Sequence, residues 1–339
     1  MKSISTLDAI KRYSFPLYRT KICELTINYN CNAKCIFCYT DNSFTNSNLK
    51  LDLKASFRYM LDSYKDGARI IQFIGGEPTV YEDLDKLILM ARKIGYKAIQ
   101  IVTNGIRLSK TAYFKRLIDA GLNCVVFSVH GSDSKIHDSI VGVNGAFNMI
   151  KKAIEYAVKN KIYITIGTAV TSINYKEIPK IAKWGYENYR IENYHFIALH
   201  FIGEAKENIK FVGVKYLETK SYIIDALKYL SLKNVFPLSP ILSNYLPCIL
   251  PGFENLISDW KIPYSFDDDL YLPQKSYRSS MYSMITDELR MKSNNCVKCV
   301  YFKICAGFER KYFEKYGDNE FIPLTSIPSP FSMNVFYKR

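Results

Sequence analysis

Cys31-Asn32-Ala33-Lys34-Cys35-Ile36-Phe37-Cys38 places three cysteines within eight residues, at the spacing C-x3-C-x2-C. The stretch follows an apolar-rich run at residues 21–28, which predicts a β-strand. A loop after a strand can direct three thiolates toward one point, where each can ligate one iron of a [4Fe–4S] cluster. The fourth iron would then have no protein ligand. The stretch therefore predicts a cluster with one open coordination position, which favours chemistry over a purely structural role.

Zinc and disulfides explain these three cysteines less well. A closed structural zinc site takes four ligands, and no histidine lies near the stretch in the sequence. The first twenty residues carry basic side chains but no apolar segment of a secretory signal, so a cytoplasmic location is expected. In that reducing compartment, nine cysteines favour metal binding over disulfides.

Composition and charge indicate a folded, basic chain. Its 339 residues are 48% hydrophobic and 23% charged, and no run of about 18 apolar residues predicts a membrane span. The net charge of +14 favours acidic partners, such as a phosphorylated substrate, an acidic peptide, RNA or an electron donor of the flavodoxin or ferredoxin kind. A lysine-rich composition spread over a solvated surface explains the charge equally well. Because no block of five or more like charges is present, nucleic acid is not expected as a partner.

Strand and helix patterns alternate up to about residue 205. Apolar runs such as residues 70–74 are typical of buried parallel strands, and glycines end several of the helical segments between them. Six β–α alternations predict a parallel sheet with right-handed crossovers, either doubly wound or curled into a partial barrel. The expected strands are 21–28, 68–74, 97–102, 123–129, 161–171 and 194–202, and the expected helices are 51–65, 81–94, 110–120, 146–159 and 173–186.

The alternation stops near residue 205. One more helix is expected at 214–232, and the run Asp267-Asp268-Asp269 predicts a hairpin with an acidic turn at 262–272. We therefore expect an N-terminal extension at 1–20, an α/β core at 21–205, and a small C-terminal domain with its tail at 206–339.

A second motif, Gly75-Gly76-Glu77-Pro78, stands directly at the end of the second expected strand. Two glycines let the backbone approach a ligand closely, and Glu77 adds a carboxylate that suits a cationic amino group. With Phe37 before the last cysteine of the first motif, the two motifs resemble the radical S-adenosylmethionine (SAM) superfamily over residues 20–205. The resemblance implies a partial (β/α)6 barrel of the TIM type, with the active site at the carboxyl ends of its strands.

The resemblance also implies an activity and a set of site residues. In this superfamily a reduced cluster cleaves SAM to a 5′-deoxyadenosyl radical, which abstracts hydrogen from a substrate. The residues that would bind the cluster are Cys31, Cys35 and Cys38, and those that would contact SAM are Phe37, Tyr39, Gly75, Gly76, Glu77, Asn104, Ser128, Thr168 and Ile197. The histidines at 130, 137 and 200 are expected to be ordinary loop or strand residues rather than catalytic ones.

Four further cysteines lie beyond the expected core. Cys296, Cys299 and Cys305 have the spacing C-x2-C-x5-C, and Cys248 precedes them. Four thiolates can close a second cluster completely, whereas zinc is the competing occupant of four-cysteine sites. The pattern resembles the auxiliary-cluster extensions called SPASM and Twitch, with room for one auxiliary [4Fe–4S] cluster. Cys248 is the weakest member of the set, and the alternative for it is a thiol that donates a hydrogen atom.

Three function hypotheses follow from these motifs. The favoured one is a radical SAM enzyme that modifies a ribosomally synthesised peptide by crosslinking, thioether formation or epimerisation, because auxiliary domains are frequent in such maturases. The second is a radical SAM enzyme that acts on a small molecule, such as a nucleotide or sugar, or on RNA. The third is a zinc-stabilised basic binding protein, against which the open three-cysteine site and residues 75–78 both argue.

Overall fold

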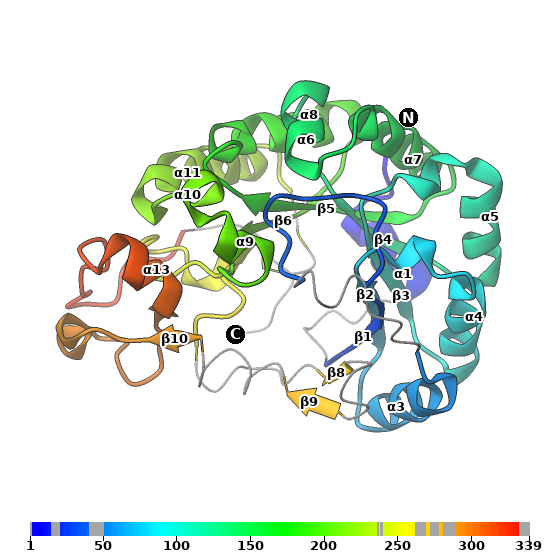
Figure 1. Cartoon of the computed structure of the whole chain (residues 1–339), viewed down its shortest axis with the longest axis horizontal. Helices are drawn as coiled ribbons and strands as arrows, with labels where there is room; N and C mark the ends of the chain where they lie inside the picture. Colours follow the sequence, from blue (N-terminus) through cyan, green and yellow to red (C-terminus); the bar gives the residue numbers. More distant parts are fainter. Residues whose placement is uncertain are drawn as a thin grey trace.

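The chain forms a curled sheet whose outer face is covered by helices (Figure 1). The computed structural model describes residues 2–14, 21–40, 51–235, 237, 240–261, 269–271, 278–280 and 289–331. Its nine-stranded sheet has the order β7-β6-β5-β4-β3-β2-β1-β8-β9. These strands are β1 (Ile22–Asn28), β2 (Ile70–Gly75), β3 (Ala98–Thr103), β4 (Cys124–Ser128), β5 (Tyr163–Val170), β6 (Asn193–Ala198), β7 (Leu242–Ser243), β8 (Asp269–Tyr271) and β9 (Arg278–Ser280).

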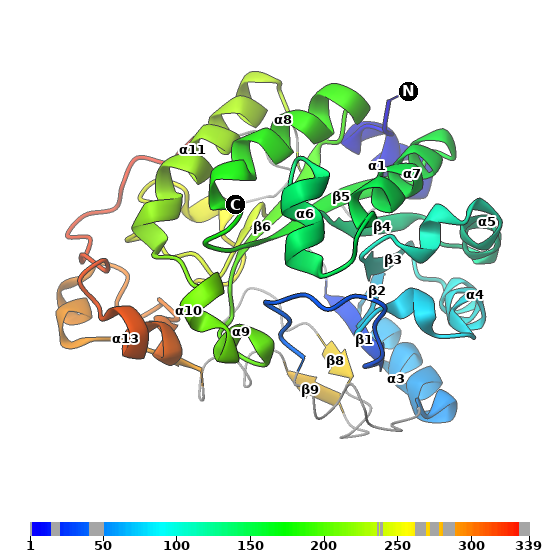
Figure 2. The ribbon, with the colours of Figure 1, turned by 45° about the horizontal axis from the view of Figure 1, so that its top comes forward.

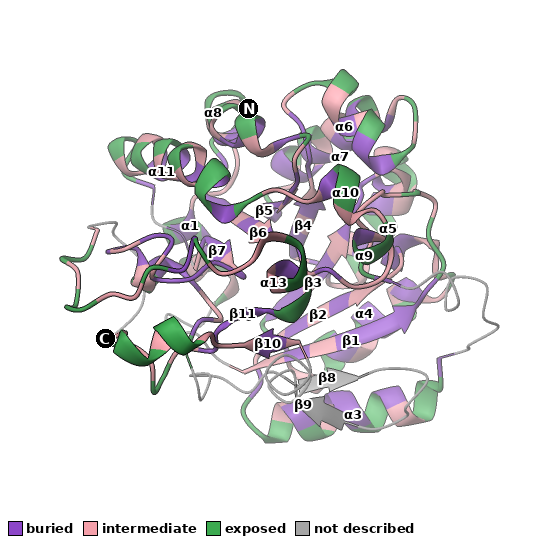
Figure 3. Ribbon diagram, turned by 60° about the vertical axis from the view of Figure 1, so that its left-hand side comes forward, coloured by how far each residue is buried: buried purple, intermediate pink, exposed green. Residues whose placement is uncertain are grey.

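The helices connect neighbouring parallel strands, and Figure 3 shows that their outward faces are exposed while the strands are mostly buried. None of the described helices is both long and apolar enough to cross a membrane. The helices of the barrel are α3 (Leu53–Lys65), α4 (Leu84–Ile94), α5 (Thr111–Ala120), α6 (Ser134–Val141), α7 (Ala146–Lys159), α8 (Ile178–Tyr189) and α11 (Tyr216–Leu232).

The predicted partial barrel is confirmed, because strands β1 to β7 are parallel and follow one another in sequence order. A doubly wound sheet would reverse its strand order at a switch point, and this sheet does not. All six expected strands are present, within a few residues of their expected ends. The carboxyl ends of parallel strands therefore meet at one rim, where the predicted motifs also lie.

Segments after residue 205 extend both edges of this sheet. β7 pairs with β6 at one edge, while β8 pairs in parallel with β1 at the other and carries the antiparallel β9. The predicted hairpin at 262–272 is wrong in its turn, because Asp269 begins β8 and its partner strand lies at 278–280; residues 262–268 lie outside the described part. A second, two-stranded sheet joins β10 (Arg290–Met291) to β11 (Phe308–Glu309), next to α13 (Arg310–Tyr316).

A short N-terminal helix, α1 (Thr6–Tyr13), closes the opposite end of the barrel, and its sequence pattern was too short to predict it. Its buried Ala9 packs in an apolar cluster with Ala98, Cys124 and Tyr163, which stand at the amino ends of β3, β4 and β5. The Tyr13 hydroxyl donates to the carbonyl of Lys161 at 2.6 Å. Cys124 in this cluster and Cys23 in β1 are both buried.

Ala9→Glu tests whether α1 is an integral part of the barrel. A carboxylate placed in this apolar cluster has no partner and too little room, so the free energy of unfolding should fall by about 3 kcal/mol. Urea unfolding followed by circular dichroism measures the loss. The matched control is Lys11→Glu, which adds the same group to the exposed face of α1 and should cost about 1 kcal/mol or less. Equal losses in the two variants would contradict the packing role of Ala9.

Candidate active site

The two glycines after β2 lie directly against the backbone that leads into the cysteine loop, residues 31–38. A Cβ atom on Gly76 would lie 2.3 Å from the carbonyl oxygen of Asn30, and one on Gly75 would lie 2.2 Å from that of Asn28. Gly75 also has a φ of 148°, which side chains rarely adopt. The amide of Gly76 donates to Asn28 at 2.9 Å, and the amide of Glu77 donates to Asn30 at 2.8 Å. The two sequence motifs therefore form one structural unit.

Glu77 turns its carboxylate into the protein. Its oxygens accept hydrogen bonds from the Thr79 amide at 3.0 Å, the Thr79 and Thr103 hydroxyls at 2.6 Å each, and the Asn104 amide at 2.8 Å. Burial raises the pKa of Glu77, and these four bonds oppose that shift by stabilising the ionised form. Because the residue is only 1% exposed, its carboxylate offers a ligand almost no surface. The sequence predicted that the Glu77 carboxylate meets a cationic amino group. In the structure this carboxylate instead joins the loop after β2 to the end of β3.

Asn104, at the end of β3, holds the cysteine loop from a second side. Its Nδ2 donates to Oδ1 of Asn32 at 2.8 Å and lies 3.9 Å from Sγ of Cys31. Its Oδ1 accepts from the amide of Ile106 at 3.0 Å, which fixes the orientation of the side-chain amide. Asn104 is therefore next to Cys31, the first predicted cluster ligand, and its predicted contact with SAM stays a prediction.

Two helices that the sequence did not predict hold the loop from its other sides (Figure 2). The amides of Lys34 and Ile36 donate to carbonyls at the end of α6, at 2.9 and 3.1 Å. After β6, the side-chain amide of Asn208 donates to the carbonyl of Ile36 at 3.0 Å. Gly203, just before α9 (Glu204–Glu207), packs so closely that a Cβ atom there would lie 2.5 Å from the carbonyl oxygen of Tyr39. Loops after β2, β3, β4 and β6 thus all fix the cysteine loop.

The three thiols of the loop lie close enough to repel one another when ionised. Burial raises the pKa of Cys31 to about 11, and the charges of Glu77 and Cys38 add to the shift. Burial also raises the pKa of Cys35, together with the charges of Cys31 and Cys38. A cationic iron cluster would offset this repulsion, so the donor set fits the predicted group. Within the described residues, no three Cys, His, Asp or Glu side chains are arranged to hold a single metal ion.

The other residues predicted to contact SAM differ in their accessibility. The Tyr39 hydroxyl donates to the carbonyl of Gly75 at 3.3 Å, and Ser128 and Ile197 are partly exposed at the ends of β4 and β6. Thr168 is completely buried, and its hydroxyl donates to the carbonyl of Val129 at 2.7 Å. Thr168 therefore has no exposed atom for a ligand in this structure, because it sits inside β5 rather than at its end.

His130 and His137 are buried beside the cysteine loop, not exposed as ordinary loop residues. The ring of Phe37 packs edge-on against His130 with 4.7 Å between centroids, and the rings of His130 and His137 are stacked at 6.0 Å. The His130 amide donates to Nδ1 of His137 at 3.2 Å. Nδ1 of His130 and Nε2 of His137 have no hydrogen-bond partner among the described residues. Burial lowers the pKa of His130 to about 3 and that of His137 to about 4, so both rings are neutral.

The second set of cysteines is assembled from distant parts of the chain. Burial raises the pKa of Cys248 to about 12, and the charges of Cys305, Cys299 and Cys296 add to the shift. Cys248 follows β7, whereas the other three lie between β10 and β11. Cys248 therefore lies within electrostatic reach of the C-x2-C-x5-C segment, and its role as a ligand stays a prediction.

A buried polar cluster connects this four-cysteine region to the barrel rim. The Glu309 carboxylate of β11 is hydrogen-bonded to Nδ1 of His200 and accepts from the amide of Phe201 at 3.0 Å. It also accepts from Nδ2 of Asn244 at 3.3 Å, and Arg290 donates to Oδ1 of Asn244 at 3.0 Å. His200 lies just beyond β6 rather than within the predicted strand, and no periodic sequence signal marked its partner Glu309.

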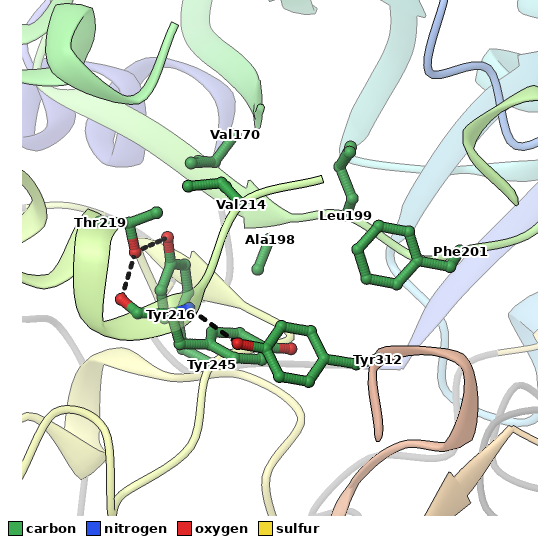
Figure 4. A pocket seen from close by; sticks show the side chains of 9 residues that line it. All are labelled: Val170, Ala198, Leu199, Phe201, Val214, Tyr216, Thr219, Tyr245 and Tyr312. Carbon is green, nitrogen blue, oxygen red and sulfur yellow. Dashed lines mark hydrogen bonds between the residues drawn. The ribbon is translucent and has the colours of Figure 1, made fainter. Parts of the chain in front are cut away.

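A small cavity lies between the ends of β5 and β6 and helix α11 (Figure 4). Its volume is about 10 Å³, which is room for about one water molecule. Figure 4 shows tyrosine rings on one side and aliphatic side chains across from them. The lining residues are Val170, Ala198, Leu199, Phe201, Val214, Tyr216, Thr219, Tyr245 and Tyr312. The cavity is too small for a substrate.

Comparison with known proteins gives a family match for the barrel. The model of the radical SAM superfamily matches residues 25–185, which include both motifs, most of β1 and all of β2 to β5. This part of the chain, a little less than half of its 339 residues, is therefore similar to the radical SAM superfamily. The similarity implies a [4Fe–4S] cluster and SAM as cofactors, which fits the donor set of the cysteine loop.

The proteins to which this chain is similar differ in kind. A probable GTP 3′,8-cyclase of Sulfolobus acidocaldarius is 30% identical over 190 residues, which cover 54% of this chain and 58% of that protein. The match thus spans less than two thirds of that relative's own length. Streptococcus suis SuiB bound to the precursor peptide SuiA has a TM-score of 0.62 at 17% identity, covering 94% of this chain and 78% of SuiB. anSMEcpe bound to AdoMet and Cp18Cys peptide has a TM-score of 0.56 at 19% identity, covering 90% and 93%.

Gly76→Ala tests the contact between the two motifs. Its Cβ atom would meet two backbone carbonyls that cannot move without shifting the cysteine loop, so the free energy of unfolding should fall by about 3 kcal/mol or more. Urea unfolding measures the loss. The control is Gly67→Ala, at a φ of 99° with no atom within 4 Å of the added Cβ, which should cost only the backbone strain of about 1–2 kcal/mol. A smaller loss at Gly76 than at Gly67 would rule out the close contact.

The buried histidine pair predicts a pH dependence of stability. The unfolded chain protonates its histidines near pH 6.5, whereas the folded protein keeps both rings neutral down to about pH 4. Their contribution to the free energy of unfolding is therefore fully present above pH 6.5 and is lost as the pH falls. The free energy of unfolding should decrease by about 1.4 kcal/mol per pH unit for each ring between about pH 6 and pH 4.5.

Urea unfolding of the metal-free protein across this range measures the slope. The His130→Leu/His137→Leu variant should lose the part of the slope that the two rings contribute. Parallel pH profiles of wild type and variant would show that the rings titrate alike in the folded and unfolded states.

Proposed function

We propose that this chain is a radical SAM enzyme with one auxiliary [4Fe–4S] cluster, and that it modifies a ribosomally synthesised peptide. The assembly of seven cysteines into two sets carries the proposal: three on the barrel rim and four in the C-terminal region. Residues 21–205 would form the radical SAM core, and residues 206–339 would supply the auxiliary cluster and additional strands at both edges of the sheet.

At the first site, the residues of the chain would bind and orient the cluster and SAM and would enclose them. Cys31, Cys35 and Cys38 would ligate the cluster, and the side-chain-free backbone at Gly75 and Gly76 would receive the amino group of SAM. When bound, the reduced cluster and SAM supply a 5′-deoxyadenosyl radical that abstracts hydrogen from the substrate. The rings of Phe37 and Tyr39 would flank the adenine, and Ser128 and Ile197 would contact SAM from the ends of β4 and β6.

Other residues would position this site rather than touch its ligands. Glu77 and Asn104 hold the loops after β2 and β3 against the cysteine loop through the hydrogen bonds described above. Thr168 would support the chain at Val129. The neutral pair of His130 and His137 provides a weakly polar wall behind Phe37, without adding positive charge near the cluster.

At the second site, Cys248, Cys296, Cys299 and Cys305 would ligate the auxiliary cluster. A cluster with four protein thiolates has no open iron, so this centre would exchange electrons rather than bind SAM. The effect of all three other thiols on the pKa of Cys248 supports Cys248 as a ligand instead of a hydrogen-atom donor.

The structural relatives favour a peptide as substrate. SuiB and anSMEcpe, each solved with a peptide bound, share the fold over at least nine tenths of this chain. A small nucleotide is the second candidate, because the probable GTP cyclase is more similar in sequence, though only over 54% of this chain.

Anaerobic reconstitution with iron and sulfide tests the proposal. The protein should contain about eight irons, four for each cluster, and should form 5′-deoxyadenosine from SAM and dithionite. The Cys31→Ala/Cys35→Ala/Cys38→Ala variant should keep about four irons and form no 5′-deoxyadenosine. The Cys248→Ala variant should lose iron from the second cluster. A colourless zinc protein that leaves SAM intact would contradict both clusters.

The substrate class is tested in the same assay. Mass spectrometry should detect a changed mass in a short peptide encoded beside the gene when it is incubated with the enzyme, SAM and dithionite. The matched control replaces the peptide with GTP. Conversion of GTP, with the peptide unchanged, would favour the small-molecule candidate.

A further inference from the structure

The segment that carries three of the four C-terminal cysteines has an exposed apolar surface. Val297 lies between Cys296 and Cys299 and is 64% exposed, while Val300 and Ile304 are 44% and 39% exposed. We define these three residues as the apolar face. Isolated apolar side chains are common on protein surfaces, but a group concentrated around one functional segment indicates an interaction site.

The chain after Phe321 extends this surface. The amide of Val300 donates to the carbonyl of Leu324 at 2.7 Å, which places the later segment beside the cysteine segment. Ile322 and Ile327 in that segment are 67% and 70% exposed. The apolar face therefore continues onto a second piece of chain.

The segment that carries the apolar face is itself basic. Residues 292–311 contain five basic residues and one acidic residue, Glu309. Glu309 is buried in the cluster with His200, so it does not reduce the positive potential at the surface as an exposed carboxylate would. Lys298 and Lys303 are exposed directly beside the apolar residues. An apolar centre with a basic rim is complementary to an acidic protein.

We propose that the apolar face and its lysines dock an acidic one-electron carrier protein, which exchanges electrons with the second cluster. This inference rests on the proposed auxiliary cluster. A carrier seated on Val297 and Lys298 would be one residue away from two of the proposed ligands, so the electron would cross a short distance. The carrier loses one electron, the centre held by these cysteines gains it, and no bond forms or breaks.

Two other occupants fit the surface less well. RNA is bound through stacking aromatic side chains and a basic groove, whereas the centre of this face is made of valine and isoleucine. A substrate peptide has to reach the barrel rim at residues 31–38, and the apolar face lies in the separate segment that ends at β11. The test below therefore includes the binding of RNA and of a peptide as alternative outcomes.

The test measures electron transfer from flavodoxin reduced to its hydroquinone. The reconstituted full-length enzyme is mixed with it anaerobically, and loss of visible cluster absorbance is followed by stopped flow at low and high salt. The same measurement in the Cys31→Ala/Cys35→Ala/Cys38→Ala background assigns the signal to the second cluster. Lys298→Glu/Lys303→Glu should lower the second-order rate constant at least tenfold at low salt and weaken its salt dependence. Val297→Ser/Ile304→Ser should lower it without a change in charge.

The matched control is Lys54→Glu/Lys152→Glu, which changes the net charge equally at exposed positions on α3 and α7 and should keep the wild-type rate. Iron content and thermal unfolding of each variant verify that it is folded and loaded. If the wild-type enzyme contains about eight irons but all variants accept electrons at the same rate, the docking face is wrong and the second cluster stands. If the wild-type enzyme contains only about four irons, the second cluster is wrong. If the charge reversal abolishes binding of an RNA oligonucleotide or an acidic peptide but leaves the carrier rate unchanged, the proposed partner is wrong.

Discussion

The backbone after β2 packs directly on the backbone that enters the cysteine loop, with no side chain between them. Gly75 and Gly76 make this contact possible, since any Cβ atom would lie within 2.3 Å of a carbonyl oxygen of Asn28 or Asn30. Two backbone hydrogen bonds fix the register of the contact. The position of all three thiols depends on it, because the loop begins at the residue after Asn30. A shift here would move the ligands relative to the other strand ends.

The buried carboxylate of Glu77 stabilises the same region, where the loop after β2 meets the end of β3. An ionised carboxylate without partners would cost several kcal/mol in such a place, but Glu77 accepts four hydrogen bonds from Thr79, Thr103 and Asn104. Every donor belongs to the loop after β2, to the last residue of β3 or to the residue that follows it. Loss of the carboxylate would therefore leave donors of both segments unsatisfied, at about 1–3 kcal/mol each if they stay buried. Glu77 therefore acts mainly through these internal hydrogen bonds and not through an exposed surface.

The C-terminal region is built onto the barrel. β7 and β8 add to opposite edges of the sheet, and one continuous apolar core includes residues from Cys23 to Phe321. Glu309 joins β11 to His200 and Phe201 at the rim, four residues after the last cysteine. This fixed connection gives the four-cysteine region a defined place beside the rim. The apolar face of this region is exposed among the described residues, and we assign it to a partner protein.

The sequence by itself determined the glycine motif, the six alternating strands and the spacing of the candidate ligands, because spacing and apolar periodicity are local properties. Periodicity could not choose a barrel over a doubly wound sheet, since strand order is set by contacts between distant segments; within the sequence, only the resemblance to a known family favoured the barrel. The burial of His130 and His137, the inward turn of Glu77 and the pairing of Asp269–Tyr271 with β1 were likewise decided only by the tertiary structure. In each case the partner lies far along the chain or in a helix too short to give a periodic signal. Desolvation and hydrogen-bond satisfaction, which act only after folding, determine these features.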